Sequence, residues 1–289
     1  MEAIELLATY PAVYLGCALV LGLLVGSFLN VVVHRLPKML ERDWIAQSRQ
    51  MLELPSEGEA EPYNLAKPHS HCPHCQHRIR PWENIPVISY IMLRGKCSSC
   101  KAPISARYPL VELTCGLLSL FVVWHFGFTW QAASALLLTW SLLAASLIDA
   151  DHQILPDIIV LPLLWVGLLV NQFELFSSLS DAVWGAAAGY MSLWVVFQLF
   201  RLITGKEGMG FGDFKLLAML GAWGGWQILP LTILLSSLVG AILGIILLRL
   251  KNAENSTPIP FGPYLAIAGW IALLWGDQIT GMYLHFAGF

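Results

Sequence analysis

The chain has 289 residues, of which 57% are hydrophobic and 12% are charged, and its mean hydropathy is +0.65. This composition excludes an ordinary soluble domain of this size, and the net charge of −3 gives no reason to expect a nucleic-acid partner. Stretches of about 20 residues, long enough to cross a hydrocarbon core, recur and are apolar on all sides. The sequence therefore predicts an all-α polytopic membrane protein, because a membrane barrel would alternate apolar and polar residues.

In chain order, the apolar stretches predict about eight transmembrane helices. They lie at residues 10–33, 109–127, 129–148, 157–173, 182–202, 213–227, 228–248 and 261–285. The sixth stretch is short and contains Gly221, Gly224 and Gly225. The sixth and seventh stretches could therefore form one tilted or broken pair.

Basic residues set the expected orientation, since Lys and Arg accumulate in cytoplasmic loops. With the N-terminus outside, every Lys and Arg lies in an inside segment or at an inside membrane edge. Glu2 and Glu5 stand where a cleavable signal peptide would be basic, so we expect the first stretch to remain as an anchor. The predicted parts are this anchor (1–33), a cytoplasmic loop domain (34–108) and a membrane-embedded helical bundle (109–289).

Four of the six cysteines fall in the predicted loop as two C-x-x-C pairs, Cys72 with Cys75 and Cys97 with Cys100. Paired knuckles of this kind favour a tetrahedral zinc site, and they are not typical of a thioredoxin-like redox centre because no βαβ pattern surrounds them. We expect the zinc to be structural, because the loop has too little apolar sequence for a core of its own.

Four histidines lie close to the first knuckle: His69, His71, His74 and His77. One of them could replace a thiolate as a zinc ligand, although we expect all four to be solvated neighbours. Cys17 and Cys115 lie in apolar stretches, and we expect both to be small buried hydrophobes.

Three carboxylates are predicted at the inside membrane edge: Asp149, Asp157 and Asp213. Two carboxylates that share a proton can hydrolyse a peptide, since one activates water and the other polarises the scissile carbonyl. Asp149 and Asp213, on different helices at one depth, fit that chemistry. The alternative is that Asp213 is a helix N-cap and the others are ordinary charges at loop edges.

Two glycines beside Asp213 and two further polar residues also have expected roles. Gly210 and Gly212 flank Phe211 just before Asp213, and we expect them to allow positive φ angles and close approach of an extended substrate. Glu112 and Asn30 lie in or near apolar stretches, where we expect them to pair across helices.

These residues lie in motifs that resemble the type IV prepilin peptidase family, the leader peptidases and N-methyltransferases of bacterial pili and type II secretion. The resemblance runs through nearly the whole chain. Its motifs are Gly26-Ser-Phe-Leu-Asn30 through Pro37, Arg94-Gly-Lys-Cys97, Ile104-Ser-Ala-Arg107 through Glu112, Asp149 with Pro156-Asp157, Gly210-Phe-Gly-Asp213-Phe-Lys215, and Ile259-Pro-Phe-Gly-Pro263, together with the knuckles of zinc-carrying members.

The resemblance implies that Asp149 and Asp213 are catalytic and that Asp151 and Asp157 are accessory at most. It implies an enzyme of the bacterial inner membrane, with its N-terminus in the periplasm and its active site in the cytoplasm. Its substrates would be type IV prepilins and type II secretion pseudopilins, which carry a short basic leader that is cleaved after its terminal glycine.

The resemblance also implies a second activity. The new N-terminal residue, commonly Phe, would be methylated from S-adenosylmethionine. We expect that site near residues 81–107, but the sequence contains no G-x-G-x-x-G motif and assigns no donor-binding residues.

Two other functions fit parts of the sequence. A proton-coupled transporter with a structural zinc module would distribute its carboxylates across the membrane, whereas here they gather at one edge. A metalloprotease would need an H-E-x-x-H motif, which does not occur. Within the aspartate pair, Asp149 closes its predicted helix and Asp213 opens the next, so we expect Asp149 to be the protonated partner and Asp213 the base.

Overall fold

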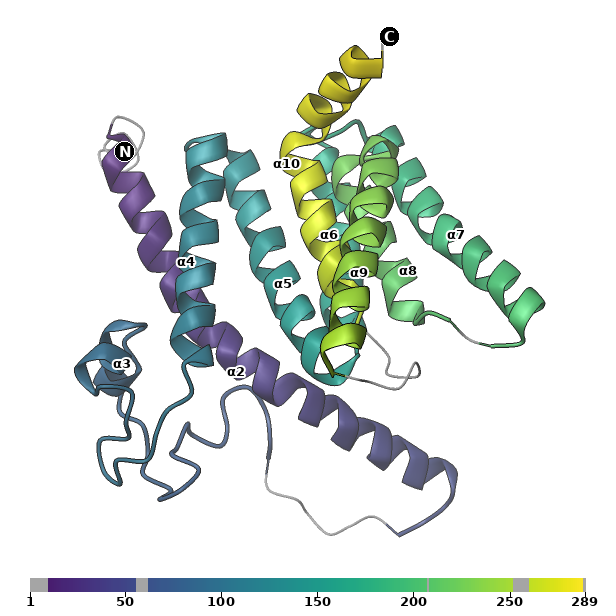
Figure 1. The fold of residues 1–289 in the computed structure, drawn as a ribbon. Coiled ribbons are helices and arrows are strands. Elements are labelled where there is room, and N and C mark those ends of the chain that lie inside the picture. Colours follow the sequence, from purple (N-terminus) through teal and green to yellow (C-terminus); the bar gives the residue numbers. More distant parts are fainter. Residues whose placement is uncertain (1–9, 56–61, 207, 252–259, 288–289) are drawn as a thin grey trace. The chain divides into compact units, whose positions relative to one another are not determined.

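The computed structural model describes residues 10–55, 62–206, 208–251 and 260–287, and it divides the chain into two compact units, residues 1–140 and 141–289. Across the described ranges the fold is helical and contains no strand. Eight long helices follow the eight predicted stretches (Figure 1). Five helical segments are long and apolar enough to cross a membrane, and a sixth is apolar but shorter. The predicted all-α polytopic fold is confirmed.

The first unit is built on two tightly packed helices, α2 (Pro11–Met51) and α4 (Arg107–Phe126). Their axes approach closely because α2 presents glycines: a Cβ atom on Gly26 would lie 2.7 Å from Glu112 Cα. The predicted pairing of polar groups across helices is confirmed for Asn30, whose amide donates to the Tyr108 carbonyl at 3.1 Å. Glu112 accepts a hydrogen bond from the backbone N–H of the loop residue Val87.

The helix α2 is longer than the predicted membrane stretch, and one expectation for it is wrong. The helix continues past residue 33 through Pro37 to Met51. Its last part is polar and exposed, so hydropathy marks only the length of helix that can lie in lipid. Cys17 is exposed rather than buried, while Cys115 on α4 is fully buried, because α2 turns only one stripe toward α4.

Between α2 and α4 the first unit carries the two cysteine knuckles, a 3-10 turn η1 (Pro81–Asn84) and a five-residue helix α3 (Ile88–Met92). The helix α5 (Trp130–His152) begins in this unit, where the Trp140 indole donates to the Ser119 hydroxyl at 2.8 Å. These connections tie the start of α5 to α4.

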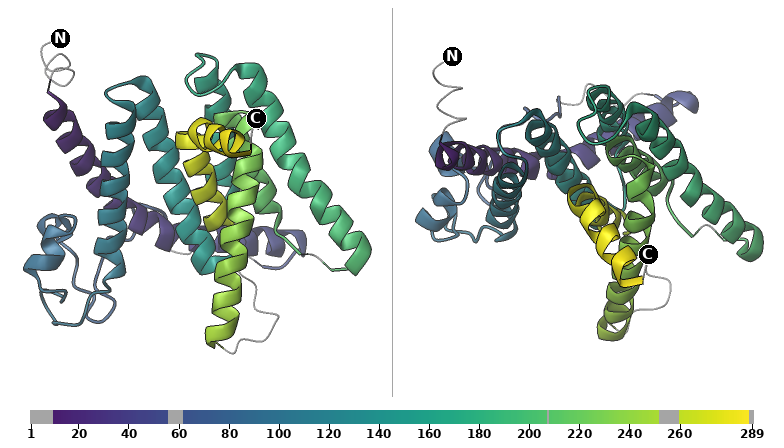
Figure 2. Two further views of the ribbon diagram at one scale, coloured as in Figure 1. Left: turned by 45° about the horizontal axis from the view of Figure 1, so that its top comes forward. Right: turned by 90° about the horizontal axis from the view of Figure 1, so that it is seen from above.

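The second unit contains the end of α5 and five further helices: α6 (Asp157–Asn171), α7 (Leu179–Thr204), α8 (Phe211–Gly224), α9 (Leu229–Lys251) and α10 (Gly262–Ala287). The short helix α8 packs against α6, α7 and α10, and most of its side chains are buried (Figures 1 and 2). Its 14 residues give roughly 21 Å of length, less than a hydrocarbon core of about 30 Å. It is the core of the unit.

Small residues and one buried amide hold α8 in place. Gly185 of α7 crosses Gly221 of α8 so closely that neither position has space for a side chain. The Asn171 amide donates to the carbonyls of Ala222 at 2.9 Å and Trp223 at 2.7 Å, which caps the end of α8. Gly225, at φ 75°, then separates α8 from α9, so the sixth and seventh stretches are a broken pair.

Candidate functional site

Asp149 lies in the last turn of α5, one turn before the chain leaves the helix. The helix ends because Gln153 adopts a positive φ of 56°, although its N–H still donates to the Asp149 carbonyl at 2.8 Å. Pro156 is extended and begins α6, which fixes the connection. The Asp149 side chain is therefore held at a helix end within the second unit.

Asp213 lies in the first turn of α8, after Gly210 in an extended N-cap conformation. Its backbone N–H donates to the Gly210 carbonyl at 3.2 Å. Phe214 and Phe211 pack against Phe197 of α7, with ring centroids 5.6 and 5.3 Å away, and this aromatic cluster fixes the start of the helix. Helix N-termini stabilise negative charge, so this location suits a carboxylate.

A third helix end completes the site. The N–H of Gly262, at the start of α10, donates to Asp149 Oδ2 at 3.0 Å. A Cβ atom on Gly262 would lie only 2.6 Å from that oxygen, so only glycine fits. In the sequence this glycine lies in a motif but has no assigned function, because no local pattern indicates which carboxylate will accept a hydrogen bond from its N–H.

The two carboxylates are almost fully buried and interact electrostatically. Asp149 is 6% exposed and Asp213 7% exposed, and the charge of Asp149 reaches Asp213. Two carboxylates this close in a medium of low polarity cannot both remain charged without cost, so they tend to hold one proton between them. Such a pair can activate water and polarise a carbonyl.

The other aspartates at this edge differ from the pair. Asp157 opens α6 and forms an ion pair with Lys215 of α8, with Nζ 2.7 and 2.8 Å from the two carboxylate oxygens. Asp151 and Asp157 are exposed. The Asp157–Lys215 pair links two helix starts, a partnership that sequence spacing did not indicate.

The predicted positive φ angles of the two glycines are wrong. Gly210 has φ −79° and Gly212 lies inside the helix, so neither adopts a positive φ. A side chain of the same protein packs against Gly212, where a Cβ atom would lie 2.9 Å from Leu155 Cβ. The close approach of an extended substrate stays a prediction.

In the first unit, the two C-x-x-C knuckles have matching backbone geometry. The N–H of Cys72 donates to His77 and that of Cys97 to Ala102, at 2.9 and 2.8 Å. The residue after each second cysteine has a positive φ, 58° at Gln76 and 62° at Lys101. Each turn therefore directs two sulfurs to one side.

The four sulfurs converge within 4.8 Å of one another and can hold a metal ion: Cys72, Cys75, Cys97 and Cys100. Backbone N–H groups of Cys75 and His74 lower the pKa of the Cys72 thiol to about 7. Similar donors at Cys100 and Ser99 lower the pKa of Cys97. At Cys72 and Cys97 these donors favour the thiolate, the form that binds metals. At Cys100, despite the Ala102 N–H, desolvation and the neighbouring thiols raise the pKa to about 11.

The histidines near the first knuckle have other partners. His77 Nε2 lies 3.3 Å from Glu83 Oε2, and His71 Nδ1 lies 2.9 Å from the His69 carbonyl. Within the described residues, the metal-binding cluster consists of the cysteines alone. The prediction that histidines are neighbours rather than ligands agrees with this arrangement.

Comparisons with known proteins cover nearly the whole chain. Residues 20–126 match the bacterial peptidase A24 N-terminal domain, and residues 136–245 match the type IV leader peptidase family. A prepilin leader peptidase/N-methyltransferase of Pseudomonas aeruginosa is 71% identical over 289 residues, all of both chains. A protein of the same name from Stutzerimonas stutzeri is 69% identical over 99% of both chains. Another from Xanthomonas campestris pv. campestris is 51% identical over 96% of this chain and 97% of the relative. No solved structure matches.

Proposed function

Because the chain belongs to the type IV leader peptidase family, we propose that Asp149 and Asp213 are the carboxylate pair with which it cleaves prepilin leaders. The observation that carries this proposal is the meeting of two buried, interacting carboxylates at the ends of α5 and α8. The enzyme is a prepilin leader peptidase and N-methyltransferase, as its relatives are named. A transporter is not favoured, because its carboxylates would lie at several depths.

The pair performs hydrolysis with one shared proton. One carboxylate takes a proton from water as it attacks the scissile carbonyl, and the other donates its proton to the carbonyl oxygen. We assign no fixed owner to the proton. The predicted difference rested on Asp149 lying at a carbonyl end of a helix, but the Gly262 N–H also stabilises a charge there.

Methyl transfer requires S-adenosylmethionine, the donor that the relatives' second activity implies. The contacts within the loop do not identify the residues that bind S-adenosylmethionine. A hollow of about 520 Å³ beside the knuckles has the necessary size, but Arg35, Arg78 and Arg80 line it without a carboxylate. The donor carries sulfonium and ammonium cations, so only its carboxylate end suits this hollow.

We assign zinc to the four cysteines as a structural ion. A zinc–sulfur bond of about 2.3 Å places the corners of a tetrahedron about 3.8 Å apart. The sulfur pairs Cys72–Cys100 and Cys75–Cys97 are 3.8 and 3.9 Å apart. This agreement, and the convergence of all four sulfurs rather than of one pair, support zinc over a redox disulfide role.

We also propose that the enzyme lies in the bacterial inner membrane, with the loop and the aspartate pair on the cytoplasmic side. The distribution of Lys and Arg supports this orientation. The proposed substrates include type II secretion pseudopilins beside type IV prepilins, because both present a basic leader before an apolar segment.

The test separates the two activities. Purified Asp213→Ala enzyme should leave a prepilin uncleaved yet methylate a pilin that lacks its leader, whereas wild-type enzyme should do both. Chelator should not stop cleavage within one turnover, because no metal takes part in the proposed step. If the variant lost both activities while keeping its thermal stability, or if brief chelation stopped cleavage, the proposal would fail.

A further inference from the structure

We propose that the segment from Trp82 to Met92 lies in the membrane interface, and that the arginine-lined hollow beside it binds the phosphate of an anionic phospholipid. Both features belong to the first unit, between α2 and α4. Neither takes part in leader cleavage as proposed above, so the inference goes beyond that function.

The depth of this segment follows from a single hydrogen bond. The N–H of Val87 donates to Glu112 Oε2 at 2.8 Å. Glu112 lies five residues after Arg107 along α4, roughly 7.5 Å deeper at 1.5 Å per residue. Gly26, within the apolar part of α2, packs directly on Glu112. The start of α3 is therefore held at or below the level where the apolar helices begin.

The side chains at this depth are apolar and turned outward. Along η1, α3 and the turn between them, large hydrophobic residues are 43–77% exposed: Trp82, Ile85, Ile88, Ile91 and Met92. Val87, a β-branched residue at φ 62°, marks a backbone that tertiary contacts force into place. A row of exposed apolar residues held at the membrane edge is suited to the boundary between headgroups and acyl chains.

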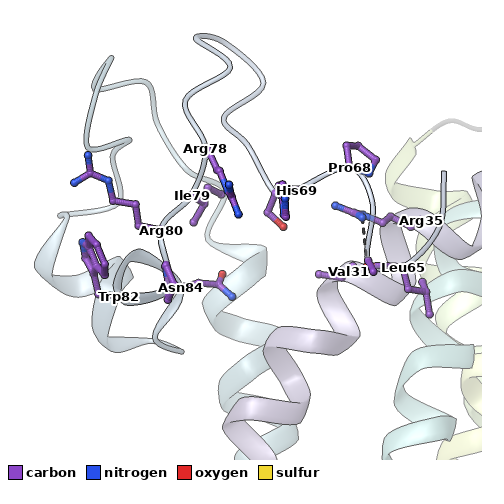
Figure 3. A pocket seen from close by; sticks show the side chains of 13 residues that line it. Val31, Arg35, Leu65, Pro68, His69, Arg78, Ile79, Arg80, Trp82 and Asn84 are labelled. Atoms are coloured by element: carbon purple, nitrogen blue, oxygen red, sulfur yellow. Dashed lines mark hydrogen bonds between the residues drawn. The ribbon is translucent and has the colours of Figure 1, made fainter. Parts of the chain in front are cut away.

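The hollow next to this segment is lined by three arginines and, among the described residues, by no carboxylate. Figure 3 shows Arg35 on one side and Arg78, Arg80 and Trp82 on the other. Arg35 is only 8% exposed, and it donates to the carbonyls of Asn64 at 3.0 Å and Leu65 at 3.3 Å. Among the described residues no carboxylate forms an ion pair with it. A buried guanidinium with only neutral acceptors favours an anion nearby.

The lining favours a lipid over other anions. Val31 brings the apolar part of α2 to the hollow, and Trp82 is shared between the hollow and the outward apolar row. The Arg80 guanidinium lies over the Trp82 ring, 5.5 Å from its centroid. A lipid whose phosphate lay in this hollow could extend its acyl chains over the apolar row that begins at Trp82. Inorganic phosphate shares the first contact but leaves the apolar row without a partner.

The experiment uses the full-length enzyme in nanodiscs of phosphatidylcholine, with or without about one third phosphatidylglycerol. Native mass spectrometry after release should show retained phosphatidylglycerol on the wild type. Arg78→Gln/Arg80→Gln should lose most of it, whereas Lys101→Gln/Lys96→Gln, which removes the same charge from the loop outside the hollow, should keep it. Equal retention by the two double variants would overturn the proposal. So would displacement of the lipid by millimolar inorganic phosphate or S-adenosylmethionine, which would identify a soluble ligand instead.

A photoactivatable phosphatidylglycerol with its diazirine in the acyl chain tests the depth separately. Adducts should map to peptides that contain residues 85–92, and Ile88→Asn/Ile91→Asn should reduce them severalfold. Adducts confined to the long helices would contradict the interfacial location. Because this readout needs no prepilin, its failure would leave the peptidase assignment intact.

Discussion

The two cysteine knuckles between α2 and α4, here called the metal loop, each take their two cysteines from one short turn. The aspartate pair instead takes its residues from helix ends that lie far apart in the chain. Each knuckle sets its two sulfurs with its own turn, closed by local backbone hydrogen bonds. Asp149, Asp213 and Gly262 meet only because three helices of the second unit converge. A site of the first kind tolerates changes elsewhere, while a site of the second kind depends on packing throughout its unit.

The largest expected effect comes from removing one carboxylate of the pair. Asp149→Asn or Asp213→Asn should slow single-turnover leader cleavage by about 10³-fold or more, because an amide cannot complete the proton exchange. Prepilin binding should persist, since the amide keeps the shape of the side chain. Asp151→Asn is the matched control and should remain near wild type. Near-normal cleavage by either pair variant would remove the basis of the dyad.

A methyl group at the third helix end should have the next largest effect. Gly262→Ala places a carbon 2.6 Å from Asp149 Oδ2, so α10 or the carboxylate must shift. A displacement near 1 Å at a catalytic group can cost about 100-fold in rate. We expect that loss in kcat with little change in KM. Gly276→Ala on the same helix, whose nearest contact would be 3.8 Å away, is the control and should keep its activity.

These two sites also differ in how far the sequence predicted them. The C-x-x-C spacing indicated all four residues of the cysteine cluster, because a turn of this length determines where its own sulfurs point. For the pair, polarity and helix position selected Asp149 and Asp213, but no local pattern indicated the Gly262 N–H or the Lys215 partner of Asp157. Those contacts depend on which helix ends meet, and hydropathy does not encode that.

Helix lengths show the same limit. Hydropathy located eight stretches and ended the first at residue 33, whereas α2 continues to Met51, because hydropathy measures fitness for lipid and not helix propensity. From Glu41 to Ser48 the side chains of α2 are exposed and include the charged Arg42 and Asp43. Conversely, the glycines at the end of α8 correctly indicated a break, since Gly225 adopts a positive φ.

The metal loop should respond locally to loss of a ligand. Cys75→Ser should lower bound zinc from about one ion per chain and expose the loop to limited proteolysis, because the metal supplies much of its folding free energy. Cys17→Ser, which removes a thiol outside the cluster, should change neither. The melting of the second unit should stay the same in both variants. Unchanged zinc content in Cys75→Ser would exclude the tetrathiolate site.

The smallest effect is expected at the Asp157–Lys215 ion pair, which lies next to the aspartate site but is exposed to solvent. Its side chains are 53% and 30% exposed, so the charges are screened although the carboxylate accepts two hydrogen bonds from one ammonium group. An exposed pair of this kind contributes about 0.2–1 kcal/mol. Asp157→Asn and Lys215→Met should each lower stability slightly and reduce cleavage only a few-fold, because the pair holds the starts of α6 and α8 rather than the reacting atoms.

A double-mutant cycle on this pair shows which kind of site it belongs to. If the pair only links two helices, the double variant should lose no more than the larger single loss, in thermal stability and in cleavage rate alike. The coupling in both measurements should also weaken with salt, as for exposed charges. A cleavage coupling many times larger than the stability coupling, and insensitive to salt, would instead make Lys215 part of the catalytic centre. The boundary of the aspartate site would then extend about half a turn further along α8.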